Sequence, residues 1–381
     1  MRIIVTSSSV ENEAAGPSYT VPALCSSMSS IGADVELLVL GKLPVNNWRF
    51  TAKAFPHSSL ALLRRLGWSR GIHKAFDEVA ENSDIFHVNG TWMLPQVYPS
   101  LSSQGKRAKV VYCPRGGLSK VTFARNRFAK WLMWHVGGQK RAIENAAMFH
   151  ATSKKEYEEI RACGFTQPVA IIPNGVEVPT TQHNPFEANQ RKLVFFGRVH
   201  ATKAVDHLIL AWGNVANEFP NWSLEIAGPD CGALQGLRAL VEERGISRVS
   251  FVGEFHGRDK YEYLAKADLY VLPSLTENFG ITIAEALACG TPVIASKGCP
   301  WSLLDSKQCG WWVDVGVDAL TSKLKEVLQL PASALKEAGE RGRRWMVEDY
   351  AWQGIAKKVL AACEWLLHQR TIPRPDFVRI D

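Results

Sequence analysis

Several features are absent from the 381 residues, and each absence excludes a class of protein. No run of about 18 apolar residues occurs, so we expect no membrane-spanning helix. The N-terminal residues MRIIVTSSSVENE contain neither the long apolar stretch nor the cleavage site of a secretory signal. Intrinsic disorder is excluded because 46% of the residues are apolar, which is enough to offset the entropy lost on folding.

Three motifs that would identify other classes of protein are also missing. They are a cysteine pair, a glycine-rich dinucleotide-binding sequence and a set of metal ligands. The eight cysteines include no C-x-x-C pair, so we expect reduced thiols in a cytoplasmic protein. The first strand-like segment leads into TSSSVENEAAGPS rather than G-x-G-x-x-G, which disfavours a dinucleotide-dependent dehydrogenase. The histidines are scattered without ligand spacing to acids or cysteines, and the sequence therefore predicts no metal site.

Acidic residues are missing from two long stretches of the N-terminal half. None occurs between Glu36 and Asp77 or between Asp84 and Glu144. Residues 1–180 hold 21 Lys and Arg against 13 Asp and Glu, whereas the remainder holds 23 against 24, so the net charge of +7 belongs to the first half. Trp, Phe and Leu lie among the basic residues, which favours an anionic membrane surface. A solvated basic face is the alternative, and nucleic-acid binding would rest on charge alone.

The chain shows a regular alternation of short apolar, β-branched segments with helical stretches. A first series of strands is expected over 2–7, 34–40, 84–90, 109–117, 147–153 and 169–175, and a second over 192–198, 222–228, 248–253, 268–274, 291–296 and 310–315. Such alternation predicts an α/β fold with parallel sheets covered by helices on both faces. We therefore expect two doubly wound, Rossmann-like domains that face each other across a cleft. Ligands should bind at the carboxyl ends of the strands.

The domain boundaries follow from a polar, proline-containing stretch. We expect an N-terminal domain over 1–177, a linker over 178–190, a C-terminal domain over 191–349, and a final helix and tail over 350–381 that packs back on the N-terminal domain. Within the first domain, the basic segment after residue 41 is expected to be helical, residues 123–146 to form one long helix, and the tail to be an irregular arm.

One constellation carries chemistry, within PSLTENFGITIAEALACGTPVIAS (273–296). Glu277 lies in the loop after a strand, and Glu285 lies about a turn and a half inside the helix that Phe279 and Gly280 open. Both carboxylates can therefore point into one cleft, where they suit the hydroxyl groups of a ribose or a hexose. The free N–H groups at the helix start suit an anion such as a diphosphate.

Two cations follow an earlier strand. Gly197 allows the backbone to approach a ligand, and Arg198 and Lys203 follow it at the carboxyl end of that strand. Each charge-assisted contact to a phosphate contributes about 1.5–3 kcal/mol. Together the two side chains can neutralise a leaving diphosphate without any proton transfer.

These segments resemble a known enzyme family. FFGRVHATKAVDHLILA and ADLYVLPSLTENFGITIAEALACGTPVIAS resemble the signature of the retaining glycosyltransferases of family 4, also called group 1 glycosyltransferases, and IIPNGVE (171–177) resembles the segment before that family's linker. The resemblance spans nearly the whole chain and is strongest over 169–315. It implies the GT-B fold, a nucleotide-diphosphate sugar bound to the C-terminal domain, an acceptor bound to the N-terminal domain, and no cofactor or divalent metal.

The resemblance also implies a role for each residue of the C-terminal motif. It makes Arg198 and Lys203 the diphosphate-binding pair and gives the reaction retention of anomeric configuration, with a leaving phosphate oxygen taking the acceptor proton. In the same way, it implies that Glu277 lies beside the donor sugar and that Glu285 binds the ribose hydroxyls. Phe279 and Gly280 would supply backbone N–H donors next to the sugar.

The N-terminal domain matches the family less closely. Gly16 stands where members often carry a Gly-Gly pair, and Arg115, in CPRGGLSK, stands where many carry a histidine. The P-R-G-G sequence resembles a polysaccharide-assembly subgroup, in which Arg115 would bind a phosphate of a lipid-diphosphate acceptor; a structural ion pair is its alternative. Asn174 is first a turn signal and second a donor contact. His87 has two equally favoured interpretations. It either lines an acceptor pocket or is a strand-end histidine whose hydrogen bonds are satisfied within the fold.

The sequence thus predicts a hexosyltransferase-type enzyme that adds a sugar to a growing lipid-linked glycan, such as a lipopolysaccharide O-antigen, a capsule or an exopolysaccharide. We expect it to be peripheral on the inner, cytoplasmic face of the plasma membrane, although for Trp131 and Trp134 core packing is favoured over lipid contact. The alternatives are a GT-B phosphorylase or nucleotide-sugar epimerase, and a non-catalytic nucleotide-binding module.

Overall fold

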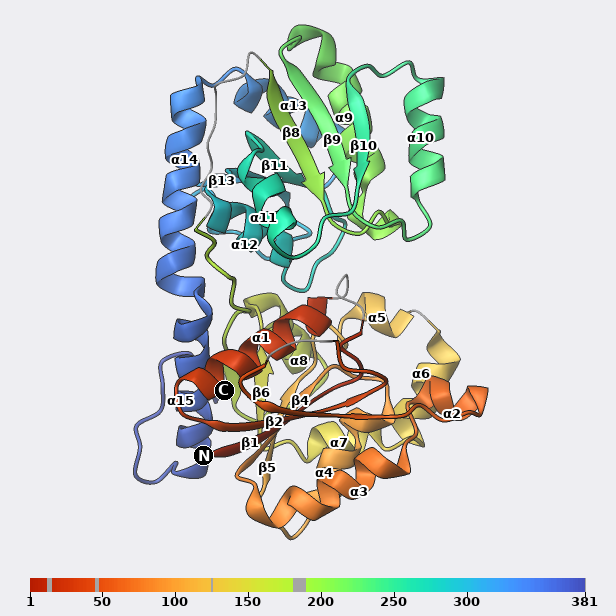
Figure 1. Ribbon diagram of the computed structural model, residues 1–381, viewed down its shortest axis with the longest axis vertical. Helices are drawn as coiled ribbons and strands as arrows, with labels where there is room; N and C mark the ends of the chain where they lie inside the picture. Colours follow the sequence, from red (N-terminus) through yellow and green to blue (C-terminus); the bar gives the residue numbers. More distant parts are fainter. Residues whose placement is uncertain (12–15, 45–47, 125, 181–189, 381) are drawn as a thin grey trace. The chain divides into compact units, whose positions relative to one another are not determined.

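The computed structural model describes residues 1–11, 16–44, 48–124, 126–180 and 190–380. It divides the chain into two compact units (Figure 1): unit 1 contains Met1–Gly175 and Trp352–Asp381, and unit 2 contains Val176–Ala351. The last helix, α15 (Trp352–Leu367), therefore belongs to unit 1, where it packs beside α1 (Gly16–Ser30). Of the linker predicted over 178–190, residues 181–189 lie outside the described residues.

The described strands of unit 1 form one sheet in the order β14-β7-β6-β5-β4-β1-β2-β3. Neighbouring strands pair in parallel from β7 to β3, whereas β14 pairs antiparallel with β7. The bounds are β1 Arg2–Ser7, β2 Asp34–Leu40, β3 Thr51–Phe55, β4 Ile85–Asn89, β5 Lys109–Cys113, β6 Met148–Ala151, β7 Val169–Ile171 and β14 Val378–Arg379.

Helices cover both faces of this sheet because its central strands are apolar on both sides. On one face, Val5, Val39 and Val111 pack with residues of α1 and α15. On the other face, Ile4 and Val88 pack with residues of the shorter helices. Those helices are α2 Ala61–Leu66, α3 Arg70–Val79, α4 Tyr98–Ser102, α5 Lys120–Ala124, α6 Arg127–His135, α7 Gln139–Glu144 and α8 Lys154–Ala162.

Three local predictions in unit 1 were wrong. The basic segment after residue 41 includes the edge strand β3, which pairs with β2 and places Lys53 2.7 Å from Glu36. The helix expected over 123–146 is divided into α5, α6 and α7, because Asn126 and Gly138 adopt left-handed backbone conformations at the starts of α6 and α7. The tail is not wholly irregular, since β14 extends the sheet edge and makes it mixed.

Unit 2 contains a parallel sheet, which within the described residues has the order β10-β9-β8-β11-β12-β13. The strands are β8 Arg191–Phe196, β9 Trp222–Ala227, β10 Val249–Gly253, β11 Leu269–Leu272, β12 Val293–Ser296 and β13 Gly310–Val313. The helices are α9 Val205–Val215, α10 Leu234–Glu243, α11 Gly257–Ala265, α12 Ile281–Cys289, α13 Val317–Leu328 and α14 Ala332–Trp345, followed by a π-helical turn at Met346–Tyr350.

The sheet order of unit 2 reverses beside its first strand, β8. The chain proceeds from β8 outward to β9 and β10, and it then returns to place β11 on the other side of β8. Loops that leave β8 and β11 diverge at this point, which is where ligands bind in doubly wound sheets. The prediction of an α/β fold with two parallel-sheet, Rossmann-like domains is confirmed. In the described part of the chain, every helix is too short or too polar to span a membrane.

Candidate active site

The first part of the site joins the loops after β8 and β11 of unit 2. The Leu275 N–H donates to the Thr202 carbonyl at 2.9 Å, which ties the two loops together. Lys203 Nζ then forms an ion pair with Glu277 Oε1, and Ser274 Oγ donates to the same oxygen at 2.7 Å. The two charged side chains are only 15% and 13% exposed. The structure therefore brings two predicted site residues together as a largely buried ion pair.

A close backbone approach holds the Glu277 loop in place. The Glu277 N–H donates to the Gly298 carbonyl at 2.9 Å. A Cβ atom at Gly298 would lie 2.3 Å from the Ser274 carbonyl oxygen, so a larger residue would push the loop away. Glycine at 298 therefore allows the two segments to meet, a role that could be assigned only once the neighbouring backbone was known.

The anion site predicted from the sequence lies at the start of α12. Gly280 adopts a left-handed conformation at φ 79° directly before the helix, which favours glycine there. The Phe279 side chain is buried against Trp301 and Tyr350, and Trp301 Nε1 donates to the Phe279 carbonyl. Phe279 thus anchors the turn through its ring and its carbonyl. The first N–H groups of a helix carry partial positive charge and suit an anion.

Glu285 has a partner that sequence reasoning missed. Its carboxylate is 2% exposed and accepts a hydrogen bond from Lys260 Nζ of α11 at 2.6 Å. Burial raises the pKa of Glu285, and the ammonium of Lys260 acts in the opposite direction. Nothing near Lys260 in the sequence marks it, because α11 meets α12 only through the tertiary fold.

Arg198 differs from these residues because it is exposed. It follows Gly197, whose carbonyl oxygen would lie 1.9 Å from a Cβ atom at Gly228, so the ends of β8 and β9 approach closely. Among the described residues, Arg198 forms no salt bridge with an acid. It is a cation beside the Lys203 loop that is open to a ligand.

A second set of polar residues lies at the carboxyl ends of the strands in unit 1. Arg115 follows β5, and its Nε and Nη2 atoms donate to Asn89 Oδ1 at 3.1 and 2.9 Å. Arg115 Nη1 also donates to Asn174 Oδ1. The structure thus joins Arg115 and Asn174, both predicted from the sequence, by a direct hydrogen bond, and Arg115 also bonds Asn89. Asn89 was not predicted.

Gly16 is not joined to this set. It begins α1, is exposed, and has no heavy atom within 4 Å of a Cβ built on it. Its carbonyl accepts a hydrogen bond from Thr20 Oγ1 at 2.9 Å. Sterics therefore do not require glycine here, and the residues just before it, 12–15, lie outside the described residues. Its role in donor binding stays a prediction.

Buried groups behind Arg115 support its loop. His87 is fully buried and contacts His150 and Asn89, so the interpretation as a satisfied strand-end histidine fits the structure. The buried Glu156 carboxylate accepts from the Gly116 N–H at 2.6 Å and from the Thr152 N–H and Oγ at 2.7 Å. Ser153 and Glu156 have the S-x-x-E spacing of a helix start, the one sequence signal that could have pointed to Glu156.

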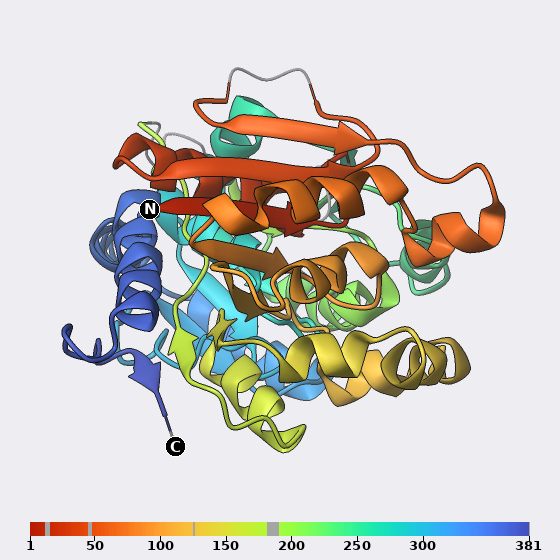
Figure 2. The same ribbon diagram turned by 90° about the horizontal axis from the view of Figure 1, so that it is seen from below.

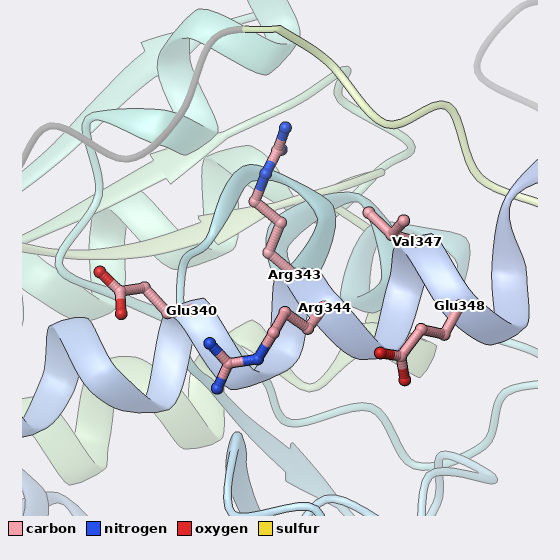
Figure 3. A pocket seen from close by; sticks show the side chains of 5 residues that line it. All are labelled: Glu340, Arg343, Arg344, Val347 and Glu348. Carbon is pink, nitrogen blue, oxygen red and sulfur yellow. The ribbon is translucent and has the colours of Figure 1, made fainter.

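A pocket lies away from the predicted site residues. Figure 3 shows the pocket on α14 and the π-helical turn after it, and none of its described lining residues is a predicted site residue; they are Glu340, Arg343, Arg344, Val347 and Glu348. Within the described part of the chain, no group of three or more His, Cys, Asp and Glu side chains is placed to hold a metal ion.

Comparisons with known proteins match both halves of the chain to glycosyltransferase families. The family "Glycosyl transferases group 1" matches residues 180–345, and the "Glycosyl transferase 4-like domain" family matches residues 15–175. A D-inositol 3-phosphate glycosyltransferase of Jonesia denitrificans is 29% identical over 253 residues, which cover 60% of this chain and 59% of that protein. The chain spans between 47% and 59% of the length of the first such relatives.

Solved structures share the fold. Sucrose-phosphate synthase from Thermosynechococcus elongatus superposes with a TM-score of 0.79 at 19% identity, covering 97% of this chain and 99% of its own. The Anabaena protein HepE, in complex with UDP and glucose, superposes with a TM-score of 0.75 at 17% identity, covering 94% of this chain and 98% of its own. With both halves matched by the family descriptions, the chain belongs to the group 1 glycosyltransferases and has their GT-B fold.

Proposed function

We propose that this protein transfers a hexose, with retention of anomeric configuration, from a nucleotide-diphosphate sugar bound to unit 2. The observation that carries the proposal is the joining of Lys203 and Glu277 beside the start of α12. A diphosphate there would meet Arg198, Lys203 and the helix N–H groups, while the Glu277 carboxylate would face the sugar. The HepE structure, which holds UDP and glucose, supports a ligand of this class.

In this mechanism the enzyme stabilises the leaving group by electrostatics. Negative charge grows on the diphosphate as the bond to the anomeric carbon breaks, and fixed cations stabilise it without reorganising. A leaving phosphate oxygen then takes the proton of the acceptor hydroxyl. Glu285 would bind the ribose hydroxyls, with Lys260 orienting its carboxylate. The proposed chemistry uses no divalent metal and no cofactor.

Thermal stabilisation by a panel of nucleotide-diphosphate sugars, followed by turnover in a chelator, tests the proposal. A donor at 100 times its Kd adds about 2.7 kcal/mol to the free energy of unfolding. We expect one donor to stabilise the protein, and Lys203→Ala to abolish that gain. Lys325→Ala, which removes only a surface ion pair with Glu218, is the matched control. Phosphate-dependent release of a sugar phosphate would instead indicate a phosphorylase, and tight binding without turnover would indicate a binding module.

For the acceptor, we propose a growing lipid-linked glycan with a phosphate that binds Arg115. The support is an exposed apolar surface on the basic unit 1, which we call the α2–α6 edge. Phe128 and Trp131 on α6 are 78% and 55% exposed, and Leu62 on α2 is 70% exposed. Trp134, in contrast, packs against Trp92 and Phe123. The expectation that both tryptophans pack in the core was therefore wrong for Trp131 and holds for Trp134.

The two helices of the α2–α6 edge contact one small apolar cluster of unit 1. Leu66 at the end of α2 packs against the same small cluster as Met133 of α6, and Figure 2 shows both helices at one edge of the unit. Basic residues of both helices accompany the apolar side chains; they are Arg64, Arg65, Arg127 and Lys130. Each basic residue near an anionic leaflet contributes about 1 kcal/mol. This combination supports peripheral attachment to the cytoplasmic leaflet of the plasma membrane.

Vesicle sedimentation tests the membrane proposal. We expect binding to vesicles with 30% phosphatidylglycerol (about a third anionic lipid) and release as salt increases, because screening weakens surface charge attraction. The double variant Phe128→Ser, Trp131→Ser should lose binding, whereas Leu303→Ser, at a 50% exposed position in unit 2, should not. Equal binding to neutral phosphatidylcholine vesicles would contradict the charge-based part of the proposal.

A further inference from the structure

A chain of buried polar side chains lies behind Arg115 in unit 1. His87 and Asn89 belong to β4 and His150 to β6, on either side of β5. Because side chains alternate along a strand, and His87 and Met148 both align with Val111, these three residues share one face of the sheet. His150 Nδ1 lies 3.1 Å from His87 Nε2, and Asn89 Nδ2 lies 3.0 Å from His87 Nδ1. All three side chains are at most 3% exposed.

The direction of every hydrogen bond in this chain follows from its far end. His150 Nε2 lies 2.8 Å from the Ile172 carbonyl oxygen, which can only accept, so Nε2 donates. In a neutral imidazole the other nitrogen then accepts, so His87 Nε2 must donate to His150 Nδ1. His87 Nδ1 in turn accepts from the Asn89 amide. The Asn89 oxygen is thereby left facing Arg115, where it accepts from Nε and Nη2.

The environment keeps both imidazoles neutral. Burial lowers the pKa of His150 to about 3, with the positive charge of Arg115 adding to the effect. Burial also lowers the pKa of His87 far below its usual value, and His150 and Arg115 contribute in the same direction. A proton on His87 Nδ1 would face the Asn89 amide hydrogens, so protonation would force that amide to turn and remove the acceptor from Arg115.

The chain holds the Arg115 guanidinium without cancelling its charge. Its acceptors, Asn89 and Asn174, are both neutral, and no acid among the described residues forms a salt bridge with it. These bonds use three of the five guanidinium N–H donors and leave two for a ligand oxygen. A partly exposed arginine that is fixed by neutral groups suits a phosphate, which needs both the charge and the planar donors.

We propose that His150 and His87 are positioning residues, which act through Asn89 to hold Arg115 as an oriented, uncompensated cation for a phosphate group of the acceptor. This inference rests on the proposed function for the identity of the acceptor. One part of the proposal needs no acceptor. The tautomer of the buried His87 controls the orientation of Arg115, which His87 does not touch.

Substitutions at His150 test the chain, with inorganic phosphate as the probe. Gln at 150 supplies an acceptor for His87 and a donor for the Ile172 carbonyl, whereas Leu supplies neither. We expect His150→Leu to weaken phosphate binding about tenfold, which is the loss of a single charged contact, and His150→Gln to stay within about threefold of the wild type. Phe149→Leu, a neighbouring buried change on the opposite face of β6, should leave phosphate binding unchanged.

Nitrogen-15 NMR of the histidine side chains gives a readout that a purely structural role would not move. In the wild type at neutral pH, His87 and His150 should both show the Nε2–H tautomer. His87 should become a tautomer mixture in His150→Leu and return to Nε2–H in His150→Gln. Where His150→Leu does not fold, the isosteric Asn89→Asp serves: it should protonate His87 and weaken phosphate binding by neutralising Arg115.

Two results would overturn the proposal: unchanged phosphate affinity and His87 tautomer in His150→Leu, or equal impairment of the Gln and Leu variants. Failure of the proposed function looks different. It would appear as no turnover of any nucleotide sugar by the wild type, with the phosphate and tautomer results as expected. If the hydrogen-bonded histidines do not position Arg115, turnover would be normal and His150→Leu would bind phosphate as the wild type does.

Discussion

The two units treat charge at their candidate sites in opposite ways. In unit 2, each predicted carboxylate already has a cation: Glu277 pairs with Lys203, and Glu285 pairs with Lys260. In unit 1, the Arg115 cation is held by carboxamides, and the buried Glu156 carboxylate is held by backbone and hydroxyl donors. Paired charges orient the two carboxylates that we propose bind sugar hydroxyl groups, whereas neutral acceptors preserve a positive charge. The difference fits a sugar donor at one site and an anionic group at the other.

The largest effect should come from unpairing a charge in unit 2. Lys260→Met leaves the Glu285 carboxylate buried without its ammonium, and removing one partner of a buried pair costs about 3–5 kcal/mol. Because burial raises the pKa of Glu285, protonation relieves part of the cost, so the loss should be greater at pH 8 than at pH 5. Urea denaturation measures it. The double variant Lys260→Met, Glu285→Gln should recover most of the stability, and equal losses in both would contradict the pairing.

The second prediction concerns turnover. Glu277→Gln keeps the shape of the side chain but removes the charge that faces Lys203 and, in the proposed function, the sugar. We expect the rate constant for transfer to fall about 10²–10³-fold, the usual cost of losing one preorganised electrostatic group. Initial-rate kinetics with the donor found by thermal stabilisation provide the measurement. Glu326→Gln, which loses a surface pair with Lys323, should keep full activity.

In unit 1, the Glu156 carboxylate should be less costly to change, because its partners are donors rather than an ion. Glu156→Gln places an amide N–H₂ against the donors from Gly116 and Thr152. We expect a loss of about 1.5–3 kcal/mol in the free energy of unfolding. The exposed Glu158→Gln on the same helix is the control. A loss no larger than that of the control would show that the Arg115 loop does not depend on this carboxylate.

A pH dependence that belongs to unit 1 should have the smallest effect near neutral pH, and it should grow as the pH falls. Since burial lowers the pKa of His150 to about 3, the unfolded chain binds more protons below about pH 6.5, and stability falls as the pH falls. Each such proton contributes a slope of about 1.4 kcal/mol per pH unit. Glu159, whose pKa burial raises to about 7, acts in the opposite direction and loses its contribution as the pH rises.

Comparing the wild type with His150→Gln isolates the histidine, because Glu159 is present in both proteins. Thermal unfolding between pH 4 and 7 (roughly the window set by the histidine) should show a shallower acid decline in the variant. Parallel curves would mean that His150 does not titrate differently in the folded protein.

The candidate donor site could be proposed from the sequence because its residues come from short, continuous segments. Lys203 and Glu277 follow strand ends that the apolar pattern marks, and Glu285 lies in the helix after the second of these loops. Parallel strands place such ends at one sheet edge, so the motif alone indicates proximity. Lys260 escaped notice because its contact depends on the packing of α11 against α12.

The candidate site in unit 1 was less predictable for the same physical reason. Arg115 and Asn174 were identified, but Asn89, His150 and Glu156 were not, since each is an ordinary strand-end or helix-start residue in its local context. The breaks between α5, α6 and α7 and the edge strand β3 were also missed. Edge pairing is decided by neighbours distant in the sequence, whereas the left-handed Gly138 belongs to a Gly-Gly pair, which is a local turn signal.

The sequence by itself determined the fold class, the two Rossmann-like units and the donor motif, because alternating apolar segments and fixed spacings along a strand–loop–helix are local properties. Only the tertiary structure decided which charges are compensated. Whether Glu285 meets an ammonium, or Arg115 meets neutral amides, depends on side chains brought from other strands and helices to within hydrogen-bond distance. Burial then sets the protonation of those groups, and burial exists only in the folded chain.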